Sequence, residues 1–402
     1  MTGTPPASFS YPITAPRPNA ADPPEILREL RDEDPLRPMT FAEGRSGWLA
    51  TGYSAVRAVL ADSRFSAKQE LMVLPVDAPG AAKGVPAEPG AFIRMDPPDH
   101  TKYRSNLIAE FTVRRMNQLE PRIVKVTNEA LDAMEAAGPP VDLIQAFALP
   151  IPSLVMCDVF GVPAEGRADF EHSMAVTDSF ESTREEVQAA FAKMSSYFPP
   201  LIESKRKNPT DDIFSGIVNG SEFTVEELTN IGLTLFVGGF ESTTHMIGLG
   251  VYSLLTNPEQ GAALRADLGL VDGAVEELLR YLSIVHRGPI RVALEDVELE
   301  GRLIKKGEPV MMSFPAANRD PHKYESPESL DITRTARGHL AFGHGVHQCI
   351  GQQLARVEMR IAFAALFERF PGLRLAVEPG EVPLKNQLFS TIHGLQKLPV
   401  AW

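Results

Sequence analysis

The stretch AFGHGVHQCIG, residues 341–351, places one cysteine, two histidines and three glycines within eleven residues. Such a cluster is consistent with a metal site, a reactive thiol, or a loop that carries an incidental thiol. The run after Gly351 has a helix-forming composition, so the sulfur of Cys349 is expected near a helix N-terminus, where the dipole and the free amides lower a thiol pKa. Thiolate is the form that ligates metals. The glycines allow the backbone to turn tightly and to approach a flat object closely.

The sequence lacks several competing motifs. No C-x-x-C pair accompanies Cys349, and with His344 and His347 it would make a crowded, unusual zinc site. No C-x-x-C-H occurs, which excludes covalent haem attachment. Gln348 stands where the third glycine of G-x-G-x-x-G belongs, and neither H-E-x-x-H nor G-x-S-x-G is found. What remains is a single thiolate donated to one axial position of a haem iron, a mode that favours O–O cleavage.

The bulk properties exclude other classes of protein. The chain has 402 residues and a formal net charge of −13, which argues against nucleic-acid binding. Its two cysteines, Cys157 and Cys349, allow no disulfide framework and favour a cytoplasmic location. No signal peptide is evident. The apolar stretch from Leu228 to Leu255 contains Glu241 at its middle, so it is expected to be a buried helix and not a membrane anchor.

The hydrophobic periodicity predicts one large domain, residues 1–402, mainly helical with a minor β part. Residues 1–22 are Pro-rich and are expected to wrap the surface in extended form. The interval from Asp62 to Asp96 has little regular periodicity, and a stretch of this kind is usually functional or disordered. The segments with a recognisable pattern are helical at 24–32, 100–207 (interrupted by prolines), 228–255, 271–282 and 352–370, and strand-like at 47–51 and 291–310.

The long helix predicted after Thr224 has an unusual centre. Thr224 and Glu227 form a capping-box pattern at its start. Gly238 and Gly239 each cost about 1 kcal/mol of helix stability relative to alanine, so their small size or a local opening of the helix must be useful. Glu241 followed by Ser242 could relay protons into a buried cavity. The alternative is that the glycines serve helix packing and that Glu241 is simply solvated.

Two shorter patterns are less specific. Glu277 and Arg280 lie three residues apart on one predicted helix face, a spacing typical of surface ion pairs. His100 and Arg104, in DPPDHTKYR, share a face at a spacing of four residues and could together hold carboxylates.

With these residues in view, FGHGVHQCIG resembles the cysteine-ligand loop of the cytochrome P-450 superfamily, whose pattern is F-G-x-G-x-H-x-C-x-G. Glu277 to Arg280 is similar to the family's E-x-x-R, and Arg334 resembles the arginine that completes that cluster. Gly238 to Ser242 is similar to the oxygen-activating groove of the central helix, although threonine is commoner than serine at position 242. The resemblance runs from about residue 90 to 360 and implies a mainly helical fold, with haem between the central helix and the cysteine loop.

The resemblance also assigns roles to single residues. Cys349 would be the axial thiolate ligand of haem b. Phe342 would pack beside it, and both Phe342 and Gly351 would contribute to haem binding. Glu241 and Ser242 would deliver protons to dioxygen. Glu277, Arg280 and Arg334 would brace the cysteine loop. The side chains implied as partners of the haem propionates are His100, Arg104, Arg291 and His347.

The resemblance implies substrate and redox partners as well. The expected reaction is insertion of one oxygen atom of O2 into a medium or large, mostly apolar metabolite in secondary metabolism; other oxidative chemistry, such as N-oxidation or coupling, and non-catalytic haem binding are the alternatives. Electrons would come from a ferredoxin and a ferredoxin reductase to a monomeric enzyme. The cations expected to receive the ferredoxin are Lys102, Arg114, Arg115, Arg356 and Arg360. The residues expected to line the substrate pocket are Val85, Phe92, Ile93, Phe180, Gly238, Phe240, Ile284, Arg287 and Ile392.

Overall fold

The computed structural model describes residues 10–11, 15–75, 84–178, 182–385 and 391–402. Its α-helices are α1 (Ile26–Glu33), α2 (Tyr53–Ala61), α3 (Asp99–Ile108), α4 (Val113–Gln118), α5 (Glu120–Ala137), α6 (Pro150–Val159), α7 (Ala164–Asp178), α8 (Arg184–Lys207), α9 (Ile213–Asn219), α10 (Val225–Thr256), α11 (Pro258–Ala266), α12 (Val271–Leu282), α13 (Phe314–Ala317) and α14 (Gln352–Arg369). Its strands are β1 (Leu36–Thr40), β2 (Ser46–Ala50), β3 (Phe65–Ser66), β4 (Val141–Asp142), β5 (Ile290–Ala293), β6 (Val297–Leu299), β7 (Arg302–Ile304), β8 (Pro309–Met312), β9 (Arg374–Leu375) and β10 (Pro399–Ala401).

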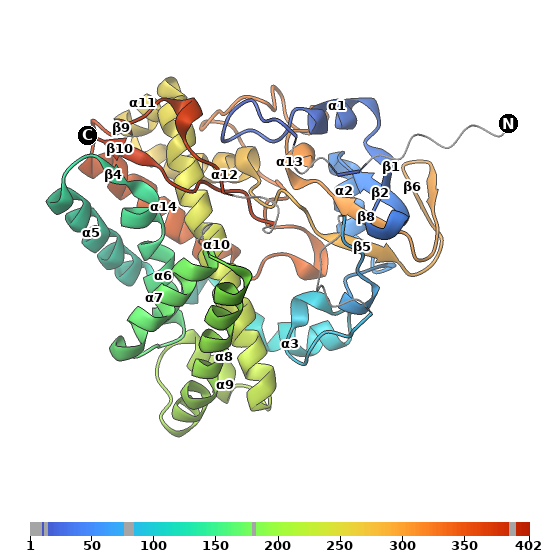
Figure 1. The fold of residues 1–402 in the computed structure, drawn as a ribbon, viewed down its shortest axis with the longest axis horizontal. Coiled ribbons are helices and arrows are strands. Elements are labelled where there is room, and N and C mark those ends of the chain that lie inside the picture. The colour runs from blue at the N-terminus through green and yellow to red at the C-terminus, as the bar shows by residue number, and fades with distance from the viewer. Residues whose placement is uncertain (1–9, 12–14, 76–83, 179–181, 386–390) are drawn as a thin grey trace.

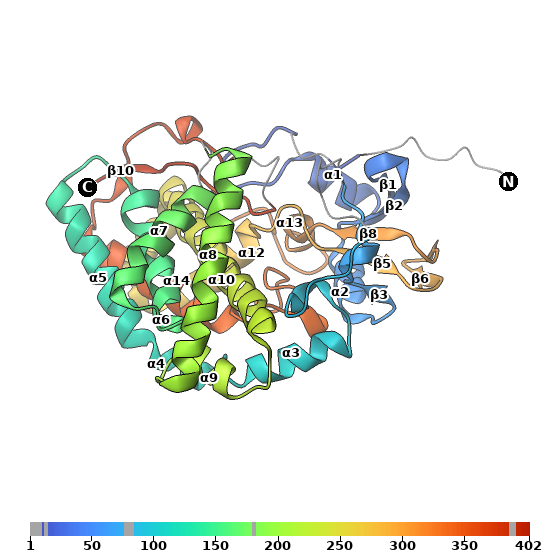
Figure 2. The same ribbon diagram turned by 60° about the horizontal axis from the view of Figure 1, so that its bottom comes forward.

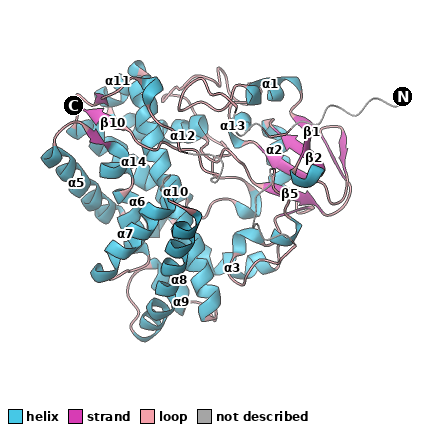
Figure 3. Ribbon diagram, viewed as in Figure 1, coloured by secondary structure: helices cyan, strands magenta, loops and turns pink. Residues whose placement is uncertain are grey.

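Most helices and the strands of the main sheet occupy different parts of the molecule, as Figure 3 shows. Most helices gather around α10, and the main sheet lies on the opposite side, near the N-terminus (Figure 1). This sheet has the order β1-β2-β8-β5-β3, in which only the β2–β8 pair is parallel. A smaller sheet, β4-β10-β9, lies near the C-terminus. The predicted class, mainly helical with a minor β part, is confirmed.

Helix α10 runs through the helical part of the molecule in both views (Figures 1 and 2). The predicted capping box is present, because Thr224 Oγ1 accepts from the amide of Glu227 at 3.1 Å and Glu227 Oε2 accepts from the amide of Thr224 at 2.8 Å. The helix continues without a break through its two central glycines. A Cβ at Gly239 would lie 2.6 Å from the sulfur of Met156 in α6, whereas a Cβ at Gly238 would meet nothing within 4 Å. Small size therefore explains Gly239, whereas no contact in the structure explains Gly238, and the helix does not open at either glycine.

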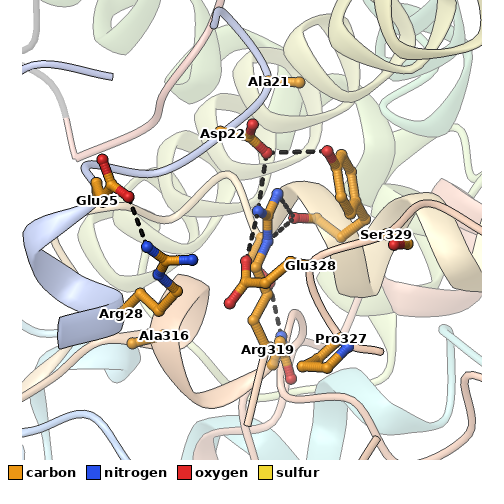
Figure 4. Close-up of polar contacts among 12 residues, drawn as sticks. Ala21, Asp22, Glu25, Arg28, Ala316, Arg319, Pro327, Glu328 and Ser329 are labelled. Carbon is orange, nitrogen blue, oxygen red and sulfur yellow. Dashed lines mark hydrogen bonds and ion pairs between the residues drawn. The ribbon is translucent and has the colours of Figure 1, made fainter. Parts of the chain in front are cut away.

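The N-terminal segment has no helix or strand before α1 within its described residues, and part of it is buried. Tyr11 is only 7% exposed. Figure 4 shows how Asp22 ties this segment to the core: it lies 2.8 Å from Arg319 and accepts a hydrogen bond of 2.9 Å from the hydroxyl of Tyr281. Arg319 also lies 3.1 Å from Glu328. The segment is therefore held by a charge network of buried Arg319, half-buried Asp22 and exposed Glu328.

The predicted elements agree closely with the structure where the sequence pattern is strong. Helices α12 and α14 and strand β2 fall at the predicted places, and the interval 291–310 contains β5 to β8. Strands β4 and β9 were not predicted, because strands of two residues leave no alternation to detect. Among the described residues, no helix has the length and apolarity of a membrane span.

Candidate functional site

The cysteine loop, residues 341–351, is shaped by its glycines. Gly343 and Gly345 have φ angles of +71° and +73°, which favour glycine over other residues. A Cβ at Gly345 would lie 2.3 Å from the carbonyl oxygen of Leu60, so only glycine lets the loop approach the end of α2 this closely. The amide of Cys349 donates to the carbonyl of Phe342 at 2.8 Å and closes the loop just before α14 begins.

The exposed surface of Cys349 faces an internal cavity, which the thiol borders. Desolvation by the surrounding protein raises the pKa of this thiol. The amide of Gly351, the guanidinium groups of Arg104 and Arg356 and the amide of Gln352 act in the opposite direction. The expected net lowering of the pKa is therefore wrong for the protein without a metal, because desolvation outweighs the amides and cations. A metal cation at the sulfur reverses this balance, since coordination deprotonates a thiol.

The cavity has a volume of about 780 Å³ and lies between α10, the cysteine loop, the start of α14 and the segment 284–291. This volume is within the range of pockets that hold cofactors and small molecules. Its wall is mainly apolar, with contributions from Phe92, Ile93, Leu235, Met246, Ile284 and Leu354. The polar and charged residues of the wall are Arg104, Thr234, Ser242, Thr243, Arg287, Arg291, His344, His347, Cys349, Glu358 and Thr391.

Two histidines and two arginines from α3, β5 and the cysteine loop form a cluster, of which Arg104, Arg291 and His347 border the cavity. The rings of His100, in α3, and His347, in the cysteine loop, lie 4.3 Å apart between centroids. Both ring nitrogens of His100 and Nε2 of His347 are buried and make no hydrogen bond within the described part of the chain. Burial, together with Arg291, His100 and Arg104, lowers the pKa of His347 to about 3. Burial lowers the pKa of Arg291 to about 10. An anion with acceptor oxygens would satisfy these donors.

Glu277 and Arg280 do not form a surface pair, because neither side chain is exposed. Arg280 donates hydrogen bonds of 2.8 Å to both carboxylate oxygens of Glu277, and Arg334 donates a third at 3.2 Å. Arg280 also donates to the carbonyls of Asn318, at 2.9 Å, and Pro327, at 2.8 Å. The structure thus brings the three predicted residues into one cluster, joined to the chain that leads to the cysteine loop.

Glu241 and Ser242 follow each other in α10 but face different surroundings. Ser242 borders the cavity, and its hydroxyl donates to the carbonyl of Gly238 at 2.7 Å. Glu241 is not among the residues that border the cavity, and its carboxylate accepts a hydrogen bond of 3.0 Å from Lys385. The acid is therefore held by a cation from the C-terminal segment and is not simply solvated.

The predicted pocket residues fall into three groups. Phe92, Ile93, Gly238, Ile284 and Arg287 border the cavity. Three others lie outside its wall: Val85 is 52% exposed, Phe240 is packed in the core at 2% exposure, and Ile392 pairs with Val285, which does border the cavity. Phe180 lies outside the described residues.

Sequence reasoning missed several polar residues of the wall, and the only acidic one among the described residues that border the cavity is Glu358 in α14. Its side chain is buried, and neither carboxylate oxygen has a hydrogen-bond partner in the described part of the chain. Burial raises its pKa from an ordinary value of 4.5 to about 8. A glutamate among Val357, Met359 and Ala362, on the buried face of the helix, was the signal that could have revealed it.

The cations expected to receive a redox partner are mostly paired within the chain. Arg114 is exposed. Arg356 also lies over the ring of Phe342, with 4.7 Å between its guanidinium carbon and the ring centroid. The pairs are Lys102 with Glu227, Arg115 with Glu110, Arg356 with Glu276 and Arg360 with Glu120. An acidic partner at this surface would compete with these carboxylates.

Comparison with known proteins defines the class to which this fold and site belong. The sequence pattern of the cytochrome P-450 family matches residues 213–396. The chain is 45% identical to cytochrome P-450 105C1 of a Streptomyces species over all of both chains. The chain therefore belongs to the cytochrome P-450 family, and it is an O2-dependent monooxygenase of the haem-thiolate type.

Two further similarities extend over nearly the whole chain. Pentalenic acid synthase of Streptomyces avermitilis is 42% identical over 99% of this chain and 99% of its own. The crystal structure of CYP105P1 in complex with filipin I is 41% identical, covers 98% of this chain and 99% of that chain, and superposes with a TM-score of 0.89.

Proposed function

We propose that this chain holds haem b in the cavity, with Cys349 as the axial thiolate, and inserts one oxygen atom into a medium or large, mostly apolar metabolite. The observation that carries the proposal is a cavity-facing thiol near buried histidine nitrogens beside Arg291. Both ring nitrogens of His100 and Nε2 of His347 have no hydrogen-bond partner in the described part of the chain. A flat tetrapyrrole with two carboxylates has the chemistry that this arrangement needs. When bound, haem supplies the redox-active iron that activates dioxygen.

The residues around the cavity have distinct tasks in this proposal. His100, Arg104, Arg291 and His347 hold the propionates and thereby orient the ring. The cluster of Glu277, Arg280 and Arg334 braces the chain that carries the cysteine loop, and Phe342 and Gly351 belong to that loop. The mainly apolar wall excludes water from the reacting atoms.

Proton transfer is assigned to the acid and the hydroxyl of α10. Ser242 borders the cavity, and its hydroxyl donates a hydrogen bond to the carbonyl of Gly238. The hydroxyl can rotate away from this carbonyl toward a water molecule or a substrate oxygen. Glu241, whose side chain is 26% exposed, can exchange its proton with solvent and return it to the cavity through Ser242.

The class of substrate is inferred from the wall and from the relatives. The wall offers many apolar side chains and few polar ones, which favours a substrate with an extended apolar surface. The names pentalenic acid synthase and CYP105P1 in complex with filipin I both refer to natural products. We therefore infer a tailoring role in secondary metabolism, with electrons from a ferredoxin and its reductase, for a single domain that acts as a monomer.

The absorption spectrum of the reduced, CO-treated protein tests the haem assignment. Wild type is expected to show the red-shifted band of a thiolate ligand, and Cys349→Ser to lose it. Cys157→Ala is the matched control, because Cys157 is buried in α6 and does not border the cavity. A wild-type spectrum without that band would refute the proposal. Shifts in the absorption spectrum of the ferric protein, measured on addition of each member of a panel of apolar natural products, would then identify the substrate class.

A further inference from the structure

The C-terminal segment reaches the centre of α10 through Lys385. The ammonium group of Lys385 lies 3.0 Å from Oε1 of Glu241 and 3.2 Å from Nε2 of His245, which is one helical turn further along. The side chain of Lys385 is only 10% exposed. Because an ammonium group has donors and no acceptor, Nε2 of His245 must accept in this contact. Lys385 therefore joins two side chains on one face of α10.

The same segment forms part of the cavity wall. The amide of Lys385 donates to the carbonyl of Gly394 at 2.9 Å, so that residues 384–385 pair with residues 394–395. The returning arm carries Thr391, which borders the cavity, and His393, whose amide donates to the carbonyl of Ile284 at 2.7 Å. Of these two paired parts of the C-terminal segment, residues 384–385 thus hold Glu241, and residues 391–395 contribute to the wall.

Close packing fixes the part of the C-terminal segment around Gly394 against α10. A Cβ at Gly394 would lie 2.1 Å from Nδ1 of His245, so the chain passes over this ring only because residue 394 is glycine. His245 is fully buried beneath it. Lys385 consequently has a defined position relative to Glu241, unlike the ammonium group of a long, exposed side chain in a surface ion pair.

We propose that Lys385 is a positioning residue for proton delivery, which holds the carboxylate of Glu241 in place. Its backbone pairs with Gly394, in the same stretch of chain as Thr391 of the cavity wall. The inference rests on the proposed function of Glu241. It adds a residue from the far end of the chain whose ammonium group lies against Glu241 and His245 of α10.

The contact itself is tested by NMR of the holoenzyme labelled with nitrogen-15 in its lysine side chains. An ammonium group held between Glu241 and His245 exchanges its protons slowly and gives a resolved signal. Lys385→Met assigns that signal by deleting it. Glu241→Gln is expected to broaden or remove it, and persistence of the signal unchanged in Glu241→Gln would overturn the proposal. This readout does not depend on catalysis.

The functional part is tested with substrate-free holoenzyme, reduced by a surrogate ferredoxin and its reductase. The fraction of reductant recovered as hydrogen peroxide, and its solvent isotope effect in heavy water, report on proton delivery. Lys385→Met is expected to change the fraction of reductant recovered as hydrogen peroxide by roughly tenfold. The reason is that Glu241, when out of position, loses part of its contribution to general acid catalysis. Lys385→Arg, which keeps the cation, should restore most of the wild-type value.

Lys397→Met is the matched control, since Lys397 is an exposed lysine of the same segment. Equal peroxide fractions and isotope effects in Lys385→Met, Lys397→Met and wild type would refute the positioning role. If Lys385→Met does not fold, the comparison of Lys385→Arg with Glu241→Gln by NMR still decides whether the contact exists. Failure of the proposed function is recognised separately, because wild type would then lack the thiolate CO band.

Discussion

Arg280 donates hydrogen bonds of 2.8 Å from Nε and Nη2 to the two carboxylate oxygens of Glu277, and neither side chain is exposed. Removal of one member of a buried ion pair leaves an uncompensated charge in the core, which costs about 3–5 kcal/mol. We expect Arg280→Met to lower the free energy of unfolding in urea by this amount. Arg28→Met, which breaks an exposed pair with Glu25, should lower it by less than about 1 kcal/mol. Equal effects of the two substitutions would contradict the structural role of Arg280.

Arg291 should control how tightly haem is held. It is buried in strand β5 at the cavity, and a hydrogen bond to a charged group contributes about 1.5–3 kcal/mol. Arg291→Met is therefore expected to accelerate transfer of haem to an acceptor apoprotein by roughly 10- to 100-fold. Arg374→Met, at an exposed position in β9, serves as the control and should leave the rate unchanged. An unchanged rate in Arg291→Met would show that Arg291 is not a propionate partner.

The two glycines of α10 should respond in opposite ways to alanine. At Gly239 the new methyl group would lie 2.6 Å from the sulfur of Met156, so α6 or this side chain must shift, and we expect destabilisation. At Gly238 it would meet nothing within 4 Å, so Gly238→Ala should gain about 1 kcal/mol of helix propensity in the apoprotein while taking up cavity volume. Thermal unfolding of the two variants measures the contrast. Destabilisation of similar size in both would contradict it.

Glu358 should make stability depend on pH. Its pKa is about 8 when folded and about 4.5 in an ordinary environment, so between these values the folded state keeps a proton that the unfolded state has released. Stability conferred by this group therefore falls as the pH rises through this window, by about 5 kcal/mol at most. Glu358→Gln cannot ionise and should lose this dependence. Urea unfolding in mildly acidic and mildly alkaline buffer measures it.

Glu368→Gln, at an exposed position of the same helix, is the control for that experiment. The expected result is a gain of stability in Glu358→Gln over wild type that is larger in alkaline than in acidic buffer. The same gain at both pH values would show that Glu358 does not titrate as its burial implies.

Ser242 should affect how efficiently reductant is converted into product. Its hydroxyl reaches the cavity, and Ser242→Ala removes it without filling space. We expect the ratio of product to reductant consumed to fall in Ser242→Ala and to be kept or raised in Ser242→Thr, because the added methyl group restricts the rotamers of the hydroxyl. An unchanged ratio in Ser242→Ala would count against a role in proton delivery.

Local patterns predicted a large part of this protein. The capping box at Thr224, the two helices α12 and α14, and the loop around Cys349 depend on residues within a few positions of one another, so backbone chemistry specifies them directly. The resemblance to the cytochrome P-450 family was carried by the same local motifs, and the comparisons confirm it. The composition and the net charge of the chain contributed to the prediction mainly by excluding other classes of protein.

The sequence by itself thus determined the family, the main helices and the cysteine that faces the cavity. Only the tertiary structure decided that Glu277 and Arg280 are buried, that Glu241 is held by Lys385, and that Val85 and Phe240 lie outside the cavity wall. The physical reason is the separation of the partners along the chain. Lys385 lies 144 residues from Glu241, and neither the contact nor the desolvation that sets a pKa has a local signature; both arise when distant segments pack together and exclude water.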